Sequence, residues 1–366
     1  MKGECLRDRL KGGVALVEKM TGKNLSLPVL SAILIEAGKG KLLLKATNLD
    51  VGIEYAVPAK LEGEGLVALG GAMLSNFLST VGGDETIKFE VVGGNLALAT
   101  KRTSTLIKSV PAEDFPVIPR VEAEETVVIS AEGLREGIRA VLYAASLSDV
   151  KPEIASIYLY ADNGELVFVA TDGFRLAEKR VQAAESTMQT ALLIPQKNAG
   201  ELLRAIENEQ GDVTVLINKN QLSLKTENLY FTTRLVVGNF PNYRQIMPTQ
   251  SKTKGTLEKR DLVQALKLSA LFSDRLSQIA LKIDPAEGVC EVESKNQDSG
   301  ENTTLLEGVF EGELATMSFN AKYVLDGLQS IGEEKVAVSL NGPGKPLVIK
   351  PVRDTSLTYL VMPMNR

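Results

Sequence analysis

The chain has 366 residues, 44% of them hydrophobic and 24% charged, and it carries a formal net charge of −5. This length predicts two or three domains, and the composition is that of a globular protein that can bury a core. Histidine is absent and no CxxC, GxGxxG or GxxxxGK[ST] sequence occurs, so the commonest catalytic base, the commonest metal ligand and the commonest phosphate-binding loops are excluded.

The opening stretch, MKGECLRDRLKGG, is charged and lacks the apolar run of a secretion signal. No window approaches the ~18 consecutive apolar residues of a membrane span. Cys5 and Cys290 are too few and too isolated for a disulfide framework or a zinc cluster. We therefore expect a cytoplasmic protein without a metal or other cofactor. The acidic balance argues against a nucleic-acid partner, although net charge does not exclude a local basic stripe.

The first unit begins with a predicted helix, LRDRLKGGVALVEKM, from Leu6. From Leu27, LPVLSAILIEAGKGKLLLKATNLD reads as a strand, a short polar turn and a second strand. After the strand GLVALGG comes a second helix, because apolar residues recur at the helical spacing i, i+3, i+4, i+7. These residues are Leu74, Phe77, Leu78 and Val81.

The same elements recur in a second unit. KPEIASIYLYADNGELVFVATDG, from Lys151, repeats the strand–turn–strand pattern, with Pro28 and Pro152 standing 124 positions apart. One helix precedes this segment and another follows it, 125 positions after the second helix of the first unit. Their apolar faces are Leu134, Ile138, Val141, Leu142 and Ala145, and then Ala199, Leu202, Leu203 and Ile206.

A third copy follows, with a helix in RDLVQALKLSALF from Arg260 and strands in RLSQIALKIDPAEGVCEVESKNQD from Arg275. Its second helix places Val324, Gly327, Leu328 and Ile331 at the repeated positions, and only Gly327 departs from the apolar pattern.

These repeats predict three tandem domains at 1–120, 121–249 and 250–366, each with two helices and several strands. Runs such as TVVIS, VTVLIN and LSLKT favour antiparallel hairpins over βαβ units. We expect an α+β fold in which amphipathic helices cover one face of each sheet. At ~125 residues, each domain is large enough for its own core. Two such chains could close head to tail into a ring.

The stretch VFVATDGFRL, residues 167–176, raises the alternative of an enzyme with Thr171 as nucleophile and Asp172 as its orienting acid. Adjacent residues of a strand point to opposite faces, and no histidine is present to act as base. A lysine-based mechanism has no motif behind it. Asp172-Gly173 is better interpreted as a hairpin turn. A second alternative is a repeat scaffold that binds proteins and needs no ring closure.

Five motifs together carry a resemblance: LPVL at 27–30, ATDGFRLA at 170–177, FPNYRQIMP at 240–248, FNAKYVLDGL at 319–328 and the ending YLVMPMNR. In this order and spacing the chain resembles the bacterial DNA sliding clamp family, the beta subunit of the replicative DNA polymerase III holoenzyme. The resemblance implies a homodimeric ring around duplex DNA, with helices lining the hole and sheets outside. It implies no catalysis, and it implies as partners the polymerase catalytic subunit, a clamp loader and other clamp-binding-motif proteins.

The resemblance implies weak, non-specific contacts to the DNA backbone, which suit a ring that slides. The corresponding positions are Lys23, Asn24, Lys151, Gln196 and Lys197, and Gln196 stands where an arginine is frequent. Further basic candidates on the predicted helices are Arg7, Arg9, Lys11, Arg135, Arg139, Arg204, Arg260, Lys267 and Lys322. The alternative for each is a solvated helix face.

The resemblance also implies a dimer interface that joins Thr105 and Ile107 of one chain to Leu271 and Phe272 of another. STLIKSV at 104–110 alternates like a strand, and an unpaired edge strand is an element that two chains can share. The alternative is an ordinary core or edge strand. Thr105 occupies a position where the family often has an aromatic ring.

Finally, the resemblance implies a peptide-binding cleft between the second and third domains. Its residues are Ile154, Thr171, Gly173, Phe174, Arg175, Leu176, Pro241, Ile246, Pro346, Leu360, Met362, Pro363 and Met364. Methionine is flexible and polarizable and suits a surface that accepts varied partners. The alternative is a core between domains. The sequence departs from the family at three positions. The family often has histidine where Phe174 stands, commonly has arginine where Gln245 stands, and has an apolar residue where Gly344 stands.

Overall fold

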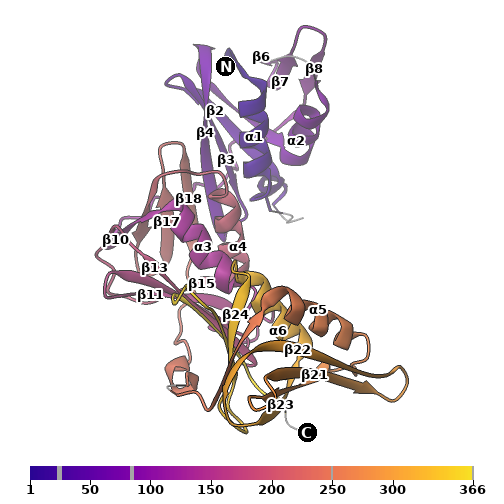
Figure 1. Ribbon diagram of the computed structural model, residues 1–366. Helices are drawn as coiled ribbons and strands as arrows, with labels where there is room; N and C mark the ends of the chain where they lie inside the picture. The colour runs from indigo at the N-terminus through magenta and orange to yellow at the C-terminus, as the bar shows by residue number, and fades with distance from the viewer. Residues whose placement is uncertain (23–26, 83–85, 249, 365–366) are drawn as a thin grey trace. The chain divides into compact units, whose positions relative to one another are not determined.

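Two continuous antiparallel sheets organise the computed structural model, which describes residues 1–22, 27–82, 86–248 and 250–364 (Figure 1). Each sheet belongs to one compact unit. Unit 1 comprises Met1–Glu132, Ala183–Gln189 and Lys197–Leu235, and unit 2 comprises Gly133–Gln182, Thr190–Gln196 and Val236–Arg366. The predicted α+β class with antiparallel pairing is confirmed.

The sheet of unit 1 has fourteen strands, ten of which follow the order β14-β10-β16-β17-β18-β4-β1-β6-β7-β8. The remaining strands, β2, β3, β5 and β9, branch from this path at β4. The strands are β1 (Lys2–Leu6), β2 (Ala32–Gly38), β3 (Lys41–Thr47), β4 (Val51–Gly63), β5 (Gly65–Gly70), β6 (Thr86–Val92), β7 (Asn95–Ala99), β8 (Ser104–Ile107), β9 (Ser109–Val110), β10 (Glu125–Ser130), β14 (Glu185–Ser186), β16 (Asp212–Ile217), β17 (Gln221–Lys225) and β18 (Leu229–Arg234).

The sheet of unit 2 has twelve strands in the order β15-β11-β12-β13-β26-β25-β24-β19-β22-β21-β20-β23. They are β11 (Ser156–Asp162), β12 (Glu165–Thr171), β13 (Arg175–Gln182), β15 (Leu192–Pro195), β19 (Thr253–Glu258), β20 (Gln278–Asp284), β21 (Val289–Asn296), β22 (Gly300–Gly312), β23 (Ala315–Asn320), β24 (Lys335–Leu340), β25 (Leu347–Pro351) and β26 (Leu357–Val361).

Each sheet crosses a predicted repeat boundary through one strand pair. In unit 1, β4 pairs with β18, and in unit 2, β13 pairs with β26. The strands of the central repeat are thereby divided, because β10, β14 and β16–β18 belong to one sheet and β11–β13 and β15 to the other. Compact units and sequence repeats therefore have different boundaries, and the predicted limits of the three domains stay a prediction.

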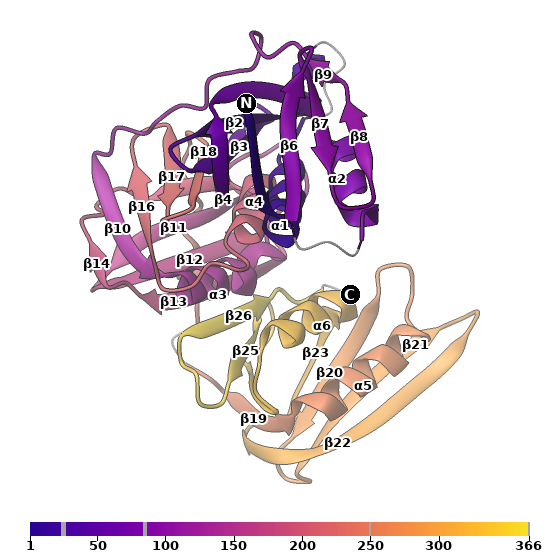
Figure 2. The ribbon, with the colours of Figure 1, turned by 90° about the horizontal axis from the view of Figure 1, so that it is seen from above.

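The helices are α1 (Arg7–Glu18), α2 (Gly71–Thr80), α3 (Ala131–Leu142), α4 (Gln196–Ala205), α5 (Lys259–Ala270) and α6 (Ala321–Ser330). Within unit 1, α1 and α2 lie side by side on one face of the sheet, and α5 and α6 do the same within unit 2 (Figure 2). Each buries one apolar stripe; in α1 this is Leu10, Gly13, Val14 and Val17. Among the described residues, none of these helices has the length and hydropathy that a membrane span requires.

Gly327, the residue of α6 that breaks the apolar repeat, is buried against the ring of Tyr359 in β26. A Cβ at this position would overlap the ring. Gly137 in α3 stands in the same relation to the ring of Phe168 in β12. In both cases a glycine permits close packing of a helix on a sheet that carries an aromatic ring. The glycine that interrupts the apolar repeat at position 327 thus marks a close contact between α6 and β26.

The turn after β12 repeats the turn after β3. In the first, the Thr171 hydroxyl donates to the Arg175 carbonyl at 2.6 Å, and in the second, the Thr47 hydroxyl donates to the Val51 carbonyl at 2.7 Å. Each turn has one residue at positive φ, which is Gly173 at 90° in one copy and Leu49 at 79° in the other. Since leucine adopts this region at a cost, the fold and not the residue type imposes the turn.

Candidate functional site

Arg175, the first residue of β13, is the centre of the described polar contacts at this turn. Its Nε donates to Asp172 Oδ2 at 2.9 Å, Nη1 to Asp326 Oδ2 at 2.5 Å and Nη2 to the Tyr143 carbonyl at 2.7 Å. Only 11% of the side chain is exposed. Burial lowers its pKa, but the hydrogen bond to Asp326 and the nearby carboxylates outweigh burial, so the pKa is raised and the guanidinium stays charged.

Two aromatic rings flank this arginine. The Arg175 guanidinium lies 4.6 Å from the centroid of the Tyr323 ring, within the range of a cation–π contact. Phe174 stacks on the same tyrosine with 6.4 Å between centroids, and 63% of Phe174 is exposed. The turn therefore exposes the apolar ring of Phe174 to solvent. The ring rests on Tyr323, which also contacts Arg175, and the ion pairs of Arg175 hold this arrangement in place.

The segment after β26 runs along this turn. The Met362 amide donates to the Phe174 carbonyl at 2.8 Å, and the Met364 amide donates to the Ser318 carbonyl of β23 at 2.9 Å. In the strand pair that precedes it, Leu176 faces Leu360. Backbone hydrogen bonds thus hold the half-buried Met362 and Met364 between the turn and β23.

A second segment, 240–248, contains the short 3-10 helix η2 (Tyr243–Ile246) and packs on the unit 2 sheet. Tyr243 is buried in a cluster with residues of β12, β13, β25 and β26, and Phe240 and Met247 pack against that cluster. The cluster residues from the sheet are Val167, Val169, Leu176, Val348 and Leu360. Pro241 and Ile246, by contrast, are exposed.

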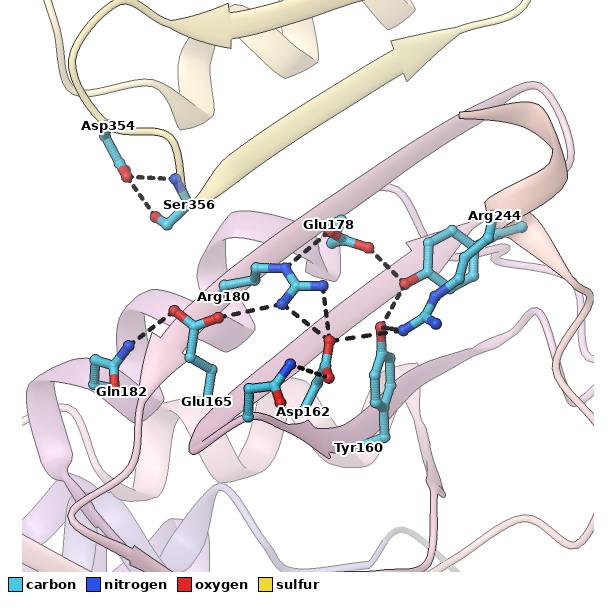
Figure 3. Close-up of polar contacts among 11 residues, drawn as sticks. Tyr160, Asp162, Glu165, Glu178, Arg180, Gln182, Arg244, Asp354 and Ser356 are labelled. Carbon is cyan, nitrogen blue, oxygen red and sulfur yellow. Dashed lines mark hydrogen bonds and ion pairs between the residues drawn. The ribbon is translucent and has the colours of Figure 1, made fainter. Parts of the chain in front are cut away.

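Polar side chains anchor this segment (Figure 3). The Tyr243 hydroxyl donates to Glu178 Oε2 at 2.5 Å and lies 2.8 Å from the Tyr160 hydroxyl, to which Arg244 Nη2 donates at 2.9 Å. Burial, together with the bonds to Glu178 and Tyr160, raises the pKa of Tyr243 far above its ordinary value. The hydroxyl therefore keeps its proton and acts as a donor.

The predicted cleft residues all lie in unit 2, and the structure brings most of them to one region. Thr171–Leu176, Leu360 and Met362–Met364 meet through strand pairing and backbone hydrogen bonds. Leu347, next to Pro346, pairs with Val361. Ile154 belongs to a turn before β11, where its amide bonds to the Lys151 carbonyl at 3.1 Å.

Burial divides these residues into two groups. Four are buried and act as support: Thr171, Leu176, Pro346 and Leu360. Exposed are Gly173, Phe174, Pro241 and Ile246, while Ile154, Arg175, Met362, Pro363 and Met364 are half-buried. The alternative of an ordinary core therefore describes the first group. Sequence reasoning did not assign Tyr323, Asp326 and Tyr243 to this region, although each lies in a motif that carried the resemblance.

Of the predicted DNA-contact positions, Lys23 and Asn24 lie outside the described residues. Lys151 is exposed, and its carbonyl accepts from the Ala155 amide at 3.1 Å. The Ala155 carbonyl in turn accepts from the Gln196 amide at 2.9 Å, so Lys151 and the start of α4 are tied together. Lys197 follows Gln196 and is exposed.

The predicted dimer positions lie at two places, each within its own unit. In unit 1, β8 ends the path of the sheet and pairs with β7, where Thr105 faces Leu98. Ile107 is 6% exposed and Leu106 is 57% exposed, because alternate residues of a strand point to opposite faces. In unit 2, Leu271 directly follows α5 with 70% exposure, and Phe272 is half-buried.

The enzyme alternative finds no support at Thr171. The Thr171 hydroxyl donates a hydrogen bond to a backbone carbonyl. The Asp172 carboxylate accepts hydrogen bonds from two backbone amides and from the Arg175 side chain. Burial raises the pKa of both Cys5 and Cys290 to about 12, so neither is a thiolate at neutral pH. No grouping of metal-ligating side chains occurs within residues 1–22, 27–82, 86–248 and 250–364.

Comparison with known proteins gives matches along the whole chain. Family models of the DNA polymerase III beta subunit match residues 1–119 as its N-terminal domain, 128–242 as its central domain and 244–365 as its C-terminal domain. The beta sliding clamp of Synechococcus elongatus is 28% identical over 372 residues, covering 100% of this chain and 99% of that protein.

Solved structures agree with these matches. The DNA polymerase III beta subunit of Thermotoga maritima is 25% identical and superimposes with a TM-score of 0.92, covering 100% of this chain and 99% of that one. A sliding clamp of Pseudomonas aeruginosa, bound to griselimycin, has a TM-score of 0.94 at 24% identity over 100% of both chains, and this likeness concerns the fold.

Proposed function

The chain belongs to the DNA polymerase III beta subunit family, and from this membership we propose that it is a sliding clamp, a ring that encircles duplex DNA and tethers the replicative polymerase to it. The observation that carries this proposal is the series of three domain matches, in family order, along nearly the whole chain. The proposal includes three domains at 1–120, 121–249 and 250–366. It also includes a cytoplasmic location, where replication takes place.

Ring closure requires a dimer, and two chains join head to tail in this proposal. The end strand β8, with its exposed Leu106, supplies one half of the interface, and the exposed Leu271 after α5 supplies the other. Both are apolar side chains at positions free to meet another copy. Thr105, Ile107 and Phe272 lie beside them.

DNA contact in this proposal is electrostatic and independent of sequence. Lys151, Gln196 and Lys197 contact the phosphates in this proposal, and such contacts weaken with salt and carry no sequence preference. The same role is predicted for Lys23 and Asn24, which lie outside the described residues. The net charge of −5 does not oppose this contact, since the chain still carries 41 lysine and arginine residues that can lie on one face.

Partner proteins bind in this proposal at a docking surface, which we define as Phe174, Pro241, Ile246, Met362 and Met364 with their neighbours from the predicted cleft. The surface combines apolar groups with a turn that the contacts of Arg175 hold in place. Such a surface suits a short peptide that inserts a few apolar anchors. The polymerase catalytic subunit, the clamp loader and other clamp-binding-motif proteins compete for it. The protein itself performs no catalysis.

Primer extension tests the proposal. With the cognate polymerase and loader on a primed single-stranded circle, adding this protein should lengthen the product of a single binding event from short to kilobase fragments. Unchanged product length would contradict a role as processivity factor.

A further inference from the structure

The docking surface depends on a segment whose two exposed residues flank a buried one. Tyr243 is 5% exposed and packs in the cluster that contains Leu176 and Leu360, whereas Pro241 and Ile246 on either side of it are exposed. The Tyr243 amide also donates to the Pro241 carbonyl at 2.7 Å. The places of these two exposed side chains therefore follow from how Tyr243 is anchored.

The anchor of Tyr243 is a hydrogen bond to a buried carboxylate. Its hydroxyl lies 2.5 Å from Glu178 Oε2, and Glu178, in the middle of β13, is 8% exposed. A bond from a hydroxyl to an ionised acceptor is shorter and stronger than a neutral one. Because Glu178 is buried, loss of the Tyr243 hydroxyl removes the hydrogen bond to Oε2, and a buried carboxylate oxygen without a partner is costly.

Glu178 is itself fixed by the strand that carries it. Arg180 Nε donates to Glu178 Oε1 at 3.3 Å, and Arg180 Nη1 donates at 3.2 Å to both Asp162 and Glu165 (Figure 3). The carboxylate therefore presents one oxygen to Arg180 and the other to Tyr243. The anchor point therefore belongs to the sheet and not to the segment 240–248.

A second tie strengthens the first. Arg244, the residue after Tyr243, donates to the Tyr160 hydroxyl at 2.9 Å, and its guanidinium lies 5.4 Å from the centroid of the Tyr160 ring. Since the Tyr160 hydroxyl also lies 2.8 Å from that of Tyr243, the two consecutive residues of η2 share one hydrogen-bonded chain. This chain runs from Glu178 through Tyr243 and Tyr160 to Arg244.

We propose that Tyr243 is a positioning residue of the docking surface. Its hydroxyl, bound to Glu178, fixes η2 on the sheet and thereby holds Pro241 and Ile246 where a peptide's apolar anchors meet them. The inference rests on the proposed docking function. Tyr243 is buried and does not itself face the partner. In this inference it nevertheless controls the affinity of the docking surface for a partner peptide.

Tyr243→Phe removes the hydroxyl and keeps the ring. Tyr158→Phe is the matched control, because Tyr158 packs in the same cluster and stacks on Phe240 at 4.7 Å, yet stands outside the hydrogen-bonded chain. The probe is a fluorescein-labelled peptide copied from the clamp-binding segment of the cognate polymerase catalytic subunit, with its Kd measured by fluorescence polarisation. We expect Tyr243→Phe to raise the Kd about 5- to 10-fold and Tyr158→Phe to change it less than about 2-fold.

A double-mutant cycle shows whether the hydroxyl acts through Glu178. Glu178→Gln keeps an oxygen acceptor but removes the charge, so it should weaken binding by about 2- to 5-fold, and it replaces Tyr243→Phe as the test if that variant does not fold. The double variant should have about the same Kd as the single variant that binds the peptide less tightly, because both changes break the same bond. Independent, multiplying effects would contradict the proposed coupling.

Thermal unfolding separates positioning from general stability. A merely structural role predicts that Tyr243→Phe lowers the unfolding temperature and leaves the Kd unchanged, and that result would overturn the inference. If the wild-type chain does not bind the peptide at all, the proposed docking function fails instead. The remaining case is that the wild type binds the peptide and that Met362→Glu with Met364→Glu abolishes this binding. If Tyr243→Phe then leaves the Kd unchanged, only the inference about Tyr243 fails.

Discussion

The Arg175 guanidinium lies 2.5 Å from the carboxylate of Asp326, a residue 151 positions later in the chain. The pair joins the turn after β12 to α6, and the same guanidinium stacks on Tyr323, which lies one turn of helix before Asp326. One arginine thus links the motif ATDGFRLA at 170–177 to the motif FNAKYVLDGL at 319–328. Its contacts determine how firmly Phe174 is presented.

Asp326→Asn tests this link. The substitution removes the charge from a partly buried pair and should lower the free energy of unfolding by about 1.5–3 kcal/mol, the range for hydrogen bonds to charged groups. Urea denaturation measures the change. Glu301→Gln is the control, because Glu301 pairs with Lys295 while both side chains are more than two-thirds exposed, and such pairs contribute little. Equal effects of the two substitutions would contradict the structural role of Arg175.

Gly327→Ala tests the contact between α6 and β26. The added methyl overlaps the Tyr359 ring, so we expect a loss of about 1–3 kcal/mol in the free energy of unfolding from overpacking. Gly12→Ala in α1 is the matched control, since a Cβ there meets no atom within 4 Å and alanine favours a helix. That variant should be neutral or more stable. A neutral Gly327→Ala would show that Tyr359 packs differently.

Acid sensitivity is expected at the loop between β25 and β26. Glu333 accepts from the Asp354, Arg353 and Val352 amides, and these bonds lower its pKa against the opposing effect of burial. Burial raises the pKa of Asp354, but bonds from Ser356 and Lys179 outweigh it, so this pKa is lowered too. Both folded pKa values lie below the unfolded ones. Their contribution to stability is therefore present above the ordinary values of 4.5 and 3.8 and is lost as pH falls through the folded values.

Urea denaturation between pH 7 and pH 3 measures this dependence. The difference in the free energy of unfolding between wild type and Asp354→Asn should be largest near neutrality and should shrink toward pH 3. A difference that stays constant over this range would contradict the assignment of the acid-sensitive group. Lys179 stays charged throughout, because its carboxylate partners outweigh burial and raise its pKa.

Replacing both Met362 and Met364 by glutamate should abolish binding of the polymerase peptide, because two charges then stand where apolar anchors insert. Light scattering should show that the variant is still a dimer. Met73→Glu is the control, since Met73 is a 63% exposed methionine of α2 in unit 1. Peptide affinity equal to that of the control would show that the docking surface lies elsewhere.

Local patterns predicted the elements and the repeats well, because helix faces and hairpin turns are encoded by neighbouring residues. Leu134, Ile138 and Val141 form the buried face of α3 as expected. Pairing between distant segments was beyond such patterns: nothing in Arg175 itself indicates that β13 joins β26 or that Asp326 is its partner. Long-range pairing is decided by the packing of the whole sheet, which the sequence does not display locally.

The sequence predicted that the cleft residues lie in one region better than it predicted their individual contacts, and the role of that region as a binding site stays a prediction. The resemblance named Leu176 and Leu360, which the structure buries at 1% exposure, and it passed over Tyr243 and Tyr323. On β8 it named Ile107, whereas the strand turns Leu106 outward. Which residue of an alternating strand faces solvent depends on register, and a shift of one position exchanges the two faces.

Retention on circular DNA tests encirclement most directly. The cognate loader places labelled protein on a nicked circular plasmid, free protein is removed by gel filtration, and the DNA is then cut once with a restriction enzyme. We predict that the protein stays on the circle and leaves after linearisation by sliding off the ends. Equal retention on circular and linear DNA would contradict a topological ring and, with it, the proposed function.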